Sequence, residues 1–229
     1  MSAEQWEVAR ATGSAAALHQ RASEPRRSVT WCEVERPAVV LGSTQPEGAV
    51  DAARAAAAGV EVARRRSGGG AVLLVPGQVV WADVVIPAGD ARWDDDVARA
   101  FVWLGRAWAT ALESLGALAA TVHEGRPVST PWSRVACFAA MGTGEVAIDG
   151  RKVVGVSQRR TRAAALFQCA CLLRWEAAAL VDVLAFDDDG ERRELARALD
   201  GAAVGLDQLT ASITPDAVEA ALLEALALC

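Results

Sequence analysis

Residues 64–72 hold the combination of side chains with the clearest chemical potential. Arginines run into Ser67 and the consecutive glycines Gly68, Gly69 and Gly70, and short apolar runs typical of strands lie on both sides. Glycines let the backbone approach a bound molecule closely, and backbone N–H groups together with guanidiniums can bind a carboxylate or a phosphate. The alternative interpretation is a flexible turn beside a solvated basic patch.

A second candidate, Lys152, lies in an Asp-Gly-Arg-Lys segment between two strand-like runs. Of the 23 lysine and arginine side chains, only this one is a lysine. An ammonium is a compact point charge that the planar guanidinium does not reproduce. We therefore expect lysine-specific chemistry here, and the alternative is a surface lysine that persisted by chance.

The composition predicts a single soluble domain in the cytoplasm. A chain of 229 residues with 52% hydrophobic content can bury a sizeable core. No apolar run approaches the roughly eighteen residues of a membrane helix, and the acidic N-terminus lacks a signal-peptide core. The five cysteines lack the spacing of metal ligands, which favours reduced thiols and no metal site. A net charge of −6 argues against general nucleic-acid binding.

The order of the expected elements indicates an α+β fold with a mixed, largely antiparallel sheet. We expect helices over residues 7–20, 49–58 and 97–115, and a tail from Trp175 that is helical in three pieces. We expect a hairpin that turns at Pro76-Gly77 and a strand at 119–123, followed by a meander. Strands are expected at 31–35, 38–42, 60–63, 71–75 and 79–86, and those of the meander at 136–138, 144–148, 152–158 and 163–173.

Together the two motif-bearing stretches resemble the family of lipoate–protein ligase A and the octanoyltransferases, which also includes the catalytic domains of biotin protein ligases. Members carry a pattern like Arg-Arg-x-Ser-Gly-Gly-Gly-Ala-Val, which residues 64–72 match. Further on they carry Gly-Arg-Lys, two apolar residues, Gly, a small residue, Ser or Ala, and Gln, which residues 150–158 match. Residues 40–45 resemble the strand and loop before the first helix of the family. The resemblance covers roughly residues 30–175 of one domain over 1–229, with a helical tail from about residue 176.

The resemblance implies a fold of the class II synthetase and biotinyl–lipoyl ligase type, and it implies chemistry. Ligases of the family join lipoate or octanoate to ATP, with Mg²⁺, as an acyl-adenylate. They then pass the acyl group to a carrier-domain lysine, as in the glycine-cleavage H protein or a 2-oxoacid dehydrogenase E2. Lys152 would lie on the carbonyl and α-phosphate oxygens, where charge develops in the transition state, and Arg65 would bind the phosphate or the acyl carboxylate. The expected substrate-binding residues are Arg65, Ser67, Gly68, Gly69, Gly70, Ala71, Val72, Gly155 and Ser157.

Cys137 resembles the nucleophile of one octanoyltransferase branch of the family. That branch has Cys-Phe ahead of the lysine motif and then a strand with Glu, which Cys137, Phe138 and Glu145 match. Its cysteine forms an acyl-thioester with an octanoyl group from acyl-carrier protein, and Lys152 would favour the thiolate or the oxyanion. The alternative is that Cys137 is a buried small hydrophobic residue. Cys169 is a lesser candidate.

Three functions follow for testing. The first is ATP-dependent ligation of lipoyl or octanoyl groups to a carrier lysine, and the second is cysteine-dependent octanoyl transfer. The third is a non-catalytic lipoate-binding module or partner subunit, because Leu73-Leu74-Val75 stand where the family has a histidine and the chain leaves no room for a large accessory domain. The two histidines, His19 and His123, are isolated and are expected to be structural or surface residues.

Overall fold

A seven-stranded sheet organises the computed structural model, which describes residues 6–117, 119–209 and 213–229. Its strand order is β1-β2-β6-β10-β9-β8-β7, and neighbours are antiparallel except β1 and β2. The α+β prediction with a mixed, largely antiparallel sheet is confirmed. The strands are β1 (Glu7–Gly13), β2 (Ser28–Val34), β6 (Val79–Pro87), β7 (Ala120–Val122), β8 (Val146–Ile148), β9 (Arg151–Arg160) and β10 (Ala164–Leu172).

A smaller sheet carries the glycine-rich stretch. It consists of β3 (Ala38–Leu41) between β4 (Glu61–Arg64), which runs parallel to it, and β5 (Val72–Leu74), which runs antiparallel. The chain turns after β5 as expected, with Gly77 at a φ of 71°. However, β5 and β6 belong to different sheets, so the expected hairpin between them is wrong. The glycine-rich loop between β4 and β5 contacts the large sheet, because the Ser67 hydroxyl donates to that of Ser157 on β9 at 3.1 Å.

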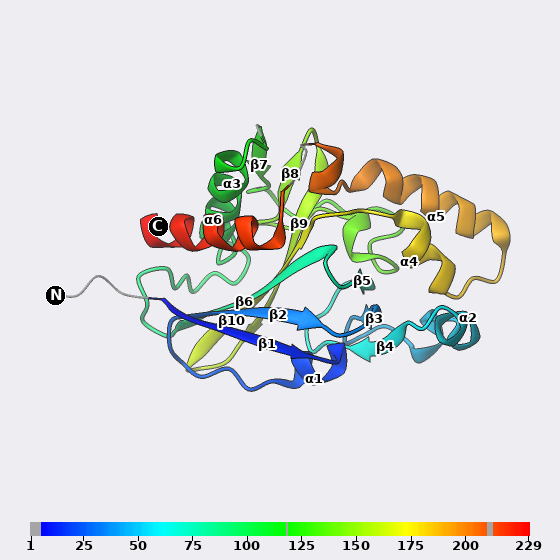
Figure 1. The fold of residues 1–229 in the computed structure, drawn as a ribbon, viewed down its shortest axis with the longest axis horizontal. Coiled ribbons are helices and arrows are strands. Elements are labelled where there is room, and N and C mark those ends of the chain that lie inside the picture. Colours follow the sequence, from blue (N-terminus) through cyan, green and yellow to red (C-terminus); the bar gives the residue numbers. More distant parts are fainter. Residues whose placement is uncertain (1–5, 118, 210–212) are drawn as a thin grey trace.

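Helices cover both sides of this arrangement (Figure 1). Helices α3 and α6 pack together on one face of the large sheet, around buried residues such as Leu104, Trp108 and Leu222. A second core lies between the two sheets and the pair α4 and α5. The helices are α1 (Ala15–Gln20), α2 (Ala52–Ala57), α3 (Val102–Ser114), α4 (Ala177–Val183), α5 (Asp189–Ala202) and α6 (Pro215–Leu228), with short 3₁₀ turns η1 (Glu47–Ala49), η2 (Cys137–Ala139) and η3 (Leu206–Gln208).

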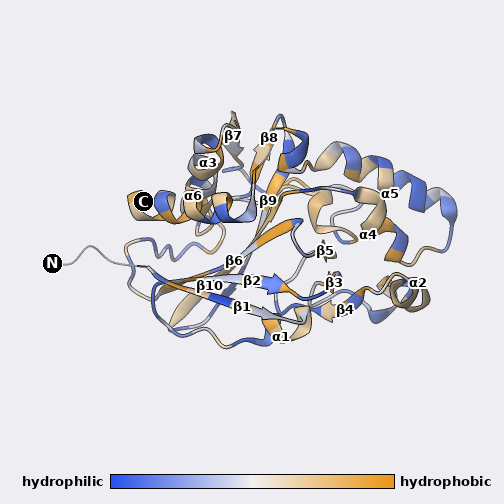
Figure 2. Cartoon of the chain, viewed as in Figure 1, coloured by the Kyte–Doolittle hydropathy of each residue, from blue (hydrophilic) through white to orange (hydrophobic). Residues whose placement is uncertain are grey.

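The hydropathy of the chain follows these layers. Figure 2 shows hydrophobic residues along β6 and β9 and many hydrophilic residues along α5. The three-helix tail is confirmed by α4, α5 and α6. In the part of the chain that the structure describes, no helix is long and apolar enough to cross a membrane.

Three local predictions are corrected by the structure. Residues 7–13 form a strand and not a helix, because they pair with β2 along their whole length, and α1 begins only after Ser14, whose side chain accepts a hydrogen bond from Ala17 N. The helix expected from residue 97 begins at Val102, because the side chains of Asp94 and Asp96 bond to nearby backbone N–H groups and form turns. Residues 137–139 form a 3₁₀ turn and not a strand.

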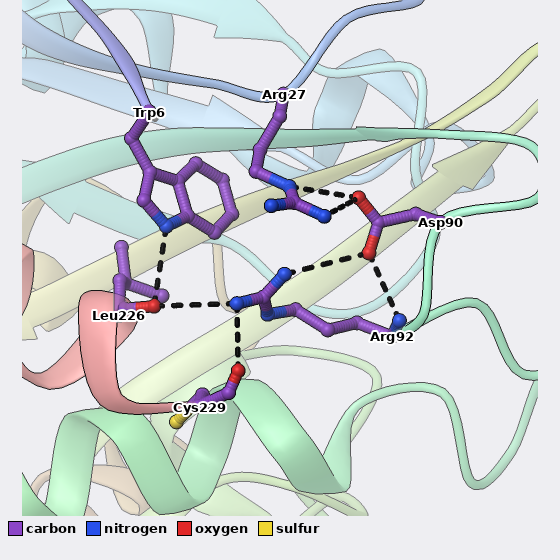
Figure 3. A network of polar contacts seen from close by, with 6 residues as sticks. All are labelled: Trp6, Arg27, Asp90, Arg92, Leu226 and Cys229. Atoms are coloured by element: carbon purple, nitrogen blue, oxygen red, sulfur yellow. Dashed lines mark hydrogen bonds and ion pairs between the residues drawn. The ribbon is translucent and has the colours of Figure 1, made fainter. Parts of the chain in front are cut away.

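A buried polar network fastens the beginning of β1 to the end of α6 (Figure 3). The Asp90 carboxylate, with 1% of its side chain exposed, accepts hydrogen bonds from Arg27 at 2.6 and 2.8 Å and pairs with Arg92 at 3.5 Å. The Arg92 guanidinium and the Trp6 indole in turn donate to the carbonyl of Leu226. One carboxylate thus holds two guanidiniums at the junction of three segments.

Candidate active site

The glycine-rich loop is bonded to the segment that carries Cys137. Ala71 N donates to Val135 O and Cys137 N donates to Ala71 O, both at 2.8 Å. A Cβ atom on Gly70 would lie 2.5 Å from the backbone of Ala136, so only glycine allows the two segments to approach this closely. Gly69 has a φ of 101°, which also requires glycine. The loop therefore places its backbone next to Cys137.

Arg65 holds this loop in shape from inside. Its buried guanidinium donates to the carbonyls of Gly68 and Gly70, each at 2.8 Å, and to Val40 O at 3.2 Å. Sequence analysis expected Arg65 to bind a phosphate or a carboxylate. In the structure it lines the cavity described below, while its donors serve three backbone oxygens. Its main observed contribution is to fix the glycine loop.

Lys152 is almost completely buried and each of its three ammonium donors has an acceptor. Its Nζ atom lies 2.6 Å from a Glu145 carboxylate oxygen, 3.0 Å from Cys137 O and 3.3 Å from Ala140 O. Nζ also lies 4.8 Å from the centre of the Phe138 ring, a cation–π contact. The tight turn at Asp149 and Gly150, both with positive φ, joins β8 to β9 and brings Glu145 and Lys152 together.

The charges around Lys152 keep it protonated. Burial by itself lowers the pKa of Lys152, but the negative charges of Cys137 and Glu145 outweigh this effect and leave the pKa above its ordinary value. Burial lowers the pKa of Arg65, and the charge of Cys137 opposes that shift. The side chain of Cys137 therefore lies within electrostatic range of two buried cations, Lys152 and Arg65.

A cavity of about 300 Å³ contains this group and extends along the large sheet. It runs from Cys137 and Lys152 past Gly155 and Ala170 to Trp81. The cavity thus crosses the sheet from β9 through β10 to β6. Two inter-strand steps span about 10 Å, which suits an extended medium-chain acyl group. The expected site residues that line it are Arg65, Gly68, Gly69, Gly70, Val72, Cys137, Lys152, Gly155 and Ser157.

Two expected substrate-binding residues lie behind the cavity wall. Ala71 is fully buried in the junction with Ala136, and the Ser67 hydroxyl donates to the Ser157 hydroxyl at 3.1 Å. The second contact connects the glycine loop with β9. Both residues therefore support the walls of the site and are not among the residues that line it.

Cys137 differs from the other cysteines in its surroundings. Cys32, Cys169 and Cys171 are buried, and burial raises the pKa of each thiol, to about 12 for Cys169. These thiols stay protonated and unreactive at neutral pH. Cys137 is only partly buried and lines the cavity. Cys169 also lines the cavity, but the combination of access and nearby cations belongs to Cys137.

Sequence reasoning missed a group of polar residues at the far end of the cavity. His19 of α1 lies over Trp81, with ring centres 4.4 Å apart, and neither of its ring nitrogens has a hydrogen-bond partner in the described structure. Gln168 lines the same end and donates to Asp83 at 3.1 Å. His19 was expected to be structural or at the surface, and no local motif around it indicates otherwise. His123 is half-buried, and its ring contacts Arg126 O at 2.8 Å away from the cavity.

Comparison with known proteins identifies relatives of this chain. The family model of the lipoyl protein ligase A/B catalytic domain matches residues 12–227. The octanoyltransferase LipM of Kyrpidia tusciae is 32% identical over 196 residues, which cover 83% of this chain and 71% of that protein.

Solved structures share the fold at low sequence identity. A bi-partite lipoate protein ligase from Thermoplasma acidophilum, described together with its E2 lipoyl domain, has a TM-score of 0.74 at 21% identity. The match covers 98% of this chain and 83% of that one. A lipoate-protein ligase A bound with ATP has a TM-score of 0.72 at 18% identity and covers 98% of this chain and 85% of that one. These matches confirm the expected fold class.

Proposed function

Because the chain belongs to the lipoyl protein ligase A/B catalytic domain family, we propose that it transfers a medium-chain acyl group through Cys137 to a carrier-domain lysine. The observation that carries this proposal is the position of Cys137. It is a partly accessible thiol in the wall of an acyl-sized cavity, it interacts with the charges of Lys152 and Arg65, and the backbone of its own loop is held by the Lys152 ammonium. The 32% identity to an octanoyltransferase supports the same route.

The reaction has two steps that balance in atoms and charge. First, the Cys137 thiolate attacks the carbonyl carbon of an acyl thioester, a new C–S bond forms, and the donor leaves as a thiolate that takes up the proton Cys137 gave up. Second, the neutral amine of the carrier lysine attacks the acyl-enzyme, the amide C–N bond forms and the C–S bond to Cys137 breaks, and the Cys137 sulfur takes up the proton that the amine nitrogen loses. Lys152 stays charged throughout and attracts the thiolate in both steps.

The backbone N–H groups of the glycine loop are available for the oxyanion of these steps. Those of Gly68, Gly69 and Gly70 donate to no other residue that the structure describes. Preorganised donors of this kind stabilise the charge that develops on a carbonyl oxygen during acyl transfer. Substitution that displaces the loop is expected to slow acylation.

ATP-dependent ligation through an acyl-adenylate, the first hypothesis from the sequence, is the second candidate. The same free N–H groups can bind a phosphate, and a solved relative of the fold is bound with ATP. Against it, the donors of Lys152 are occupied by Glu145, Cys137 and Ala140, so a phosphate would have to displace one of them.

The proposed partners follow from the route. The acyl donor is octanoyl-acyl-carrier protein, the acceptor is the lipoyl domain of an E2 or the glycine-cleavage H protein, and the reaction takes place in the cytoplasm. A structural relative is described together with its E2 lipoyl domain, which makes such a domain the first acceptor to try.

Intact-mass analysis of an apo lipoyl domain incubated with the protein tests the route. Parallel samples contain octanoyl-acyl-carrier protein without ATP, octanoate with Mg-ATP, and lipoate with Mg-ATP. We expect acylation of the lipoyl domain from the thioester alone, through an acyl-enzyme that the Cys137→Ser variant does not form. Acylation only with ATP, and equally in Cys137→Ser, would establish the ligase instead. No acylation in any sample would favour a non-catalytic binding module.

A further inference from the structure

The entrance of the cavity can be located from the exposure of its lining. Most lining residues are buried or half-buried, but Gly68 and Gly69 of the glycine loop and residues 127–129 of the loop after β7 are exposed. Val128 is 54% exposed, and its backbone pairs with Met141 beside the cavity. The carrier lysine must reach Cys137 between these two loops.

Four exposed arginines lie within two residues, along the chain, of residues that line the cavity. Arg66 precedes the glycine loop, Arg126 precedes the exposed residues 127–129, and Arg134 follows the lining residue Ser133. Arg159 is two residues beyond Ser157 on β9, so its side chain leaves the same face of the strand as that lining residue.

The charges of these four arginines are not compensated by carboxylates of the described residues. None of the four forms an ion pair within the described structure, whereas Arg26, Arg36 and Arg99 are each paired with a carboxylate. Arg66 binds only the neutral amide of Gln20, at 2.6 and 3.0 Å. Glu124, the exposed acidic residue closest in sequence to Arg126, is paired with Arg106.

We propose that Arg66, Arg126, Arg134 and Arg159 form a docking surface for an acidic protein face that surrounds the acyl-accepting lysine. The chain has a net charge of −6, so most of its surface repels an acidic partner. Uncompensated positive charge at the cavity opening attracts such a partner to that opening. This inference rests on the proposed function, because it takes the entrance to Cys137 as the place where the carrier domain docks. Exposed charges of this kind act mainly on the association rate and its dependence on salt.

A double charge reversal, Arg66→Glu with Arg159→Glu, tests the surface. Arg193→Glu is the control, because Arg193 is exposed, forms no ion pair with the residues that the structure describes, and lies on α5, none of whose residues lines the cavity. Loading of Cys137 from a small uncharged thioester, octanoyl-N-acetylcysteamine, needs no docking and reports on an intact site. We expect the wild type, the double variant and Arg193→Glu all to become octanoylated at Cys137. The rate of transfer to an E2 lipoyl domain at low salt should fall by about tenfold or more in the double variant only. The difference should shrink as salt is raised.

Equal transfer by the loaded double variant and the wild type would overturn the inference. If the wild type itself does not load, the proposed function fails, and binding of the lipoyl domain alone still decides the inference. In that case calorimetric titration at low and high salt should show weaker binding for the double variant and unchanged binding for Arg193→Glu. Equal affinities for all three proteins would again overturn it.

Discussion

The Lys152 ammonium lies 2.6 Å from the Glu145 carboxylate, and 2% and 7% of the two side chains are exposed. Neither charge could remain buried alone, because transfer of a single ion into the interior costs several kcal/mol. The Glu145 carboxylate also accepts hydrogen bonds from the backbone N–H groups of Gly142, at 2.5 Å, and Val156, at 3.3 Å. The pair therefore connects the loop that carries Cys137 to β9.

Replacement of Lys152 by methionine is expected to affect both stability and chemistry. It leaves the Glu145 charge buried without a partner, so the free energy of unfolding should fall by about 3–5 kcal/mol, as measured by urea denaturation. The double variant Lys152→Met with Glu145→Gln removes both charges and should recover much of that stability. It should still fail to form an acyl-thioester, because the cation beside Cys137 is absent. Acylation at the wild-type rate by the double variant would contradict the role given to Lys152.

The cysteines are expected to differ sharply in reactivity. Brief treatment with iodoacetamide at neutral pH should label Cys137 and the exposed Cys229, because both are accessible. Cys32, Cys169 and Cys171 should react only after unfolding, because burial excludes the reagent and raises the pKa of each thiol. Peptide mass analysis measures the labelling, with Cys229→Ser as the background that isolates Cys137. Rapid labelling of Cys169 in the folded protein would contradict the assignment.

The residues that the sequence singled out by type and order lie close together in the structure. The glycines, the single lysine and the Cys-Phe pair were identified from their kinds and order, and the structure brings them around one cavity. The roles of Arg65 and Ala71 could not be predicted, because they depend on contacts with Val40 and Ala136 that only the folded chain provides.

Local propensity failed where pairing between distant segments decides the structure. A helix was expected over residues 7–20, which include the alanine run 15–17, yet residues 7–13 add a parallel strand to β2. Cys137 was placed in a strand because its neighbours are apolar, but its N–H bonds to Ala71 and the chain then turns. His19 was missed for a similar reason, since only the packing of α1 over Trp81 brings it to the cavity.

The Asp90 network gives a prediction about stability that is independent of catalysis. Asp90→Asn keeps the shape of the side chain but removes a buried carboxylate that contacts both Arg27 and Arg92, so unfolding should become easier by about 3–5 kcal/mol. Glu33→Gln, which removes an exposed partner of Arg10, is the control and should change stability by less than about 1 kcal/mol. Urea denaturation of the two variants and the wild type measures this, and a similar small effect in both would contradict the assigned role of Asp90.

The last prediction concerns two buried groups that titrate in opposite directions. Burial, with a further contribution from the charge of Arg65, lowers the pKa of His19 from 6.5 to about 4. Burial raises the pKa of Asp83 from 3.8 to about 6, although hydrogen bonds from Trp81 and Gln168 oppose the shift. The contribution of His19 to stability is present above pH 6.5 and is lost as the pH falls toward 4. That of Asp83 is present below pH 3.8 and is lost as the pH rises through 6.

Between about pH 4 and 6 the two contributions therefore cancel in the wild type. Asp83→Asn keeps an oxygen to accept the bonds from Trp81 and Gln168 but removes one titration, so acidification through this range should destabilise this variant by roughly 3 kcal/mol more than the wild type. His19→Gln should show the opposite, a gain in stability on acidification relative to the wild type. The double variant should follow the wild-type curve. Urea denaturation at closely spaced pH values measures these slopes, and parallel curves for all four proteins would show that neither group is perturbed by burial.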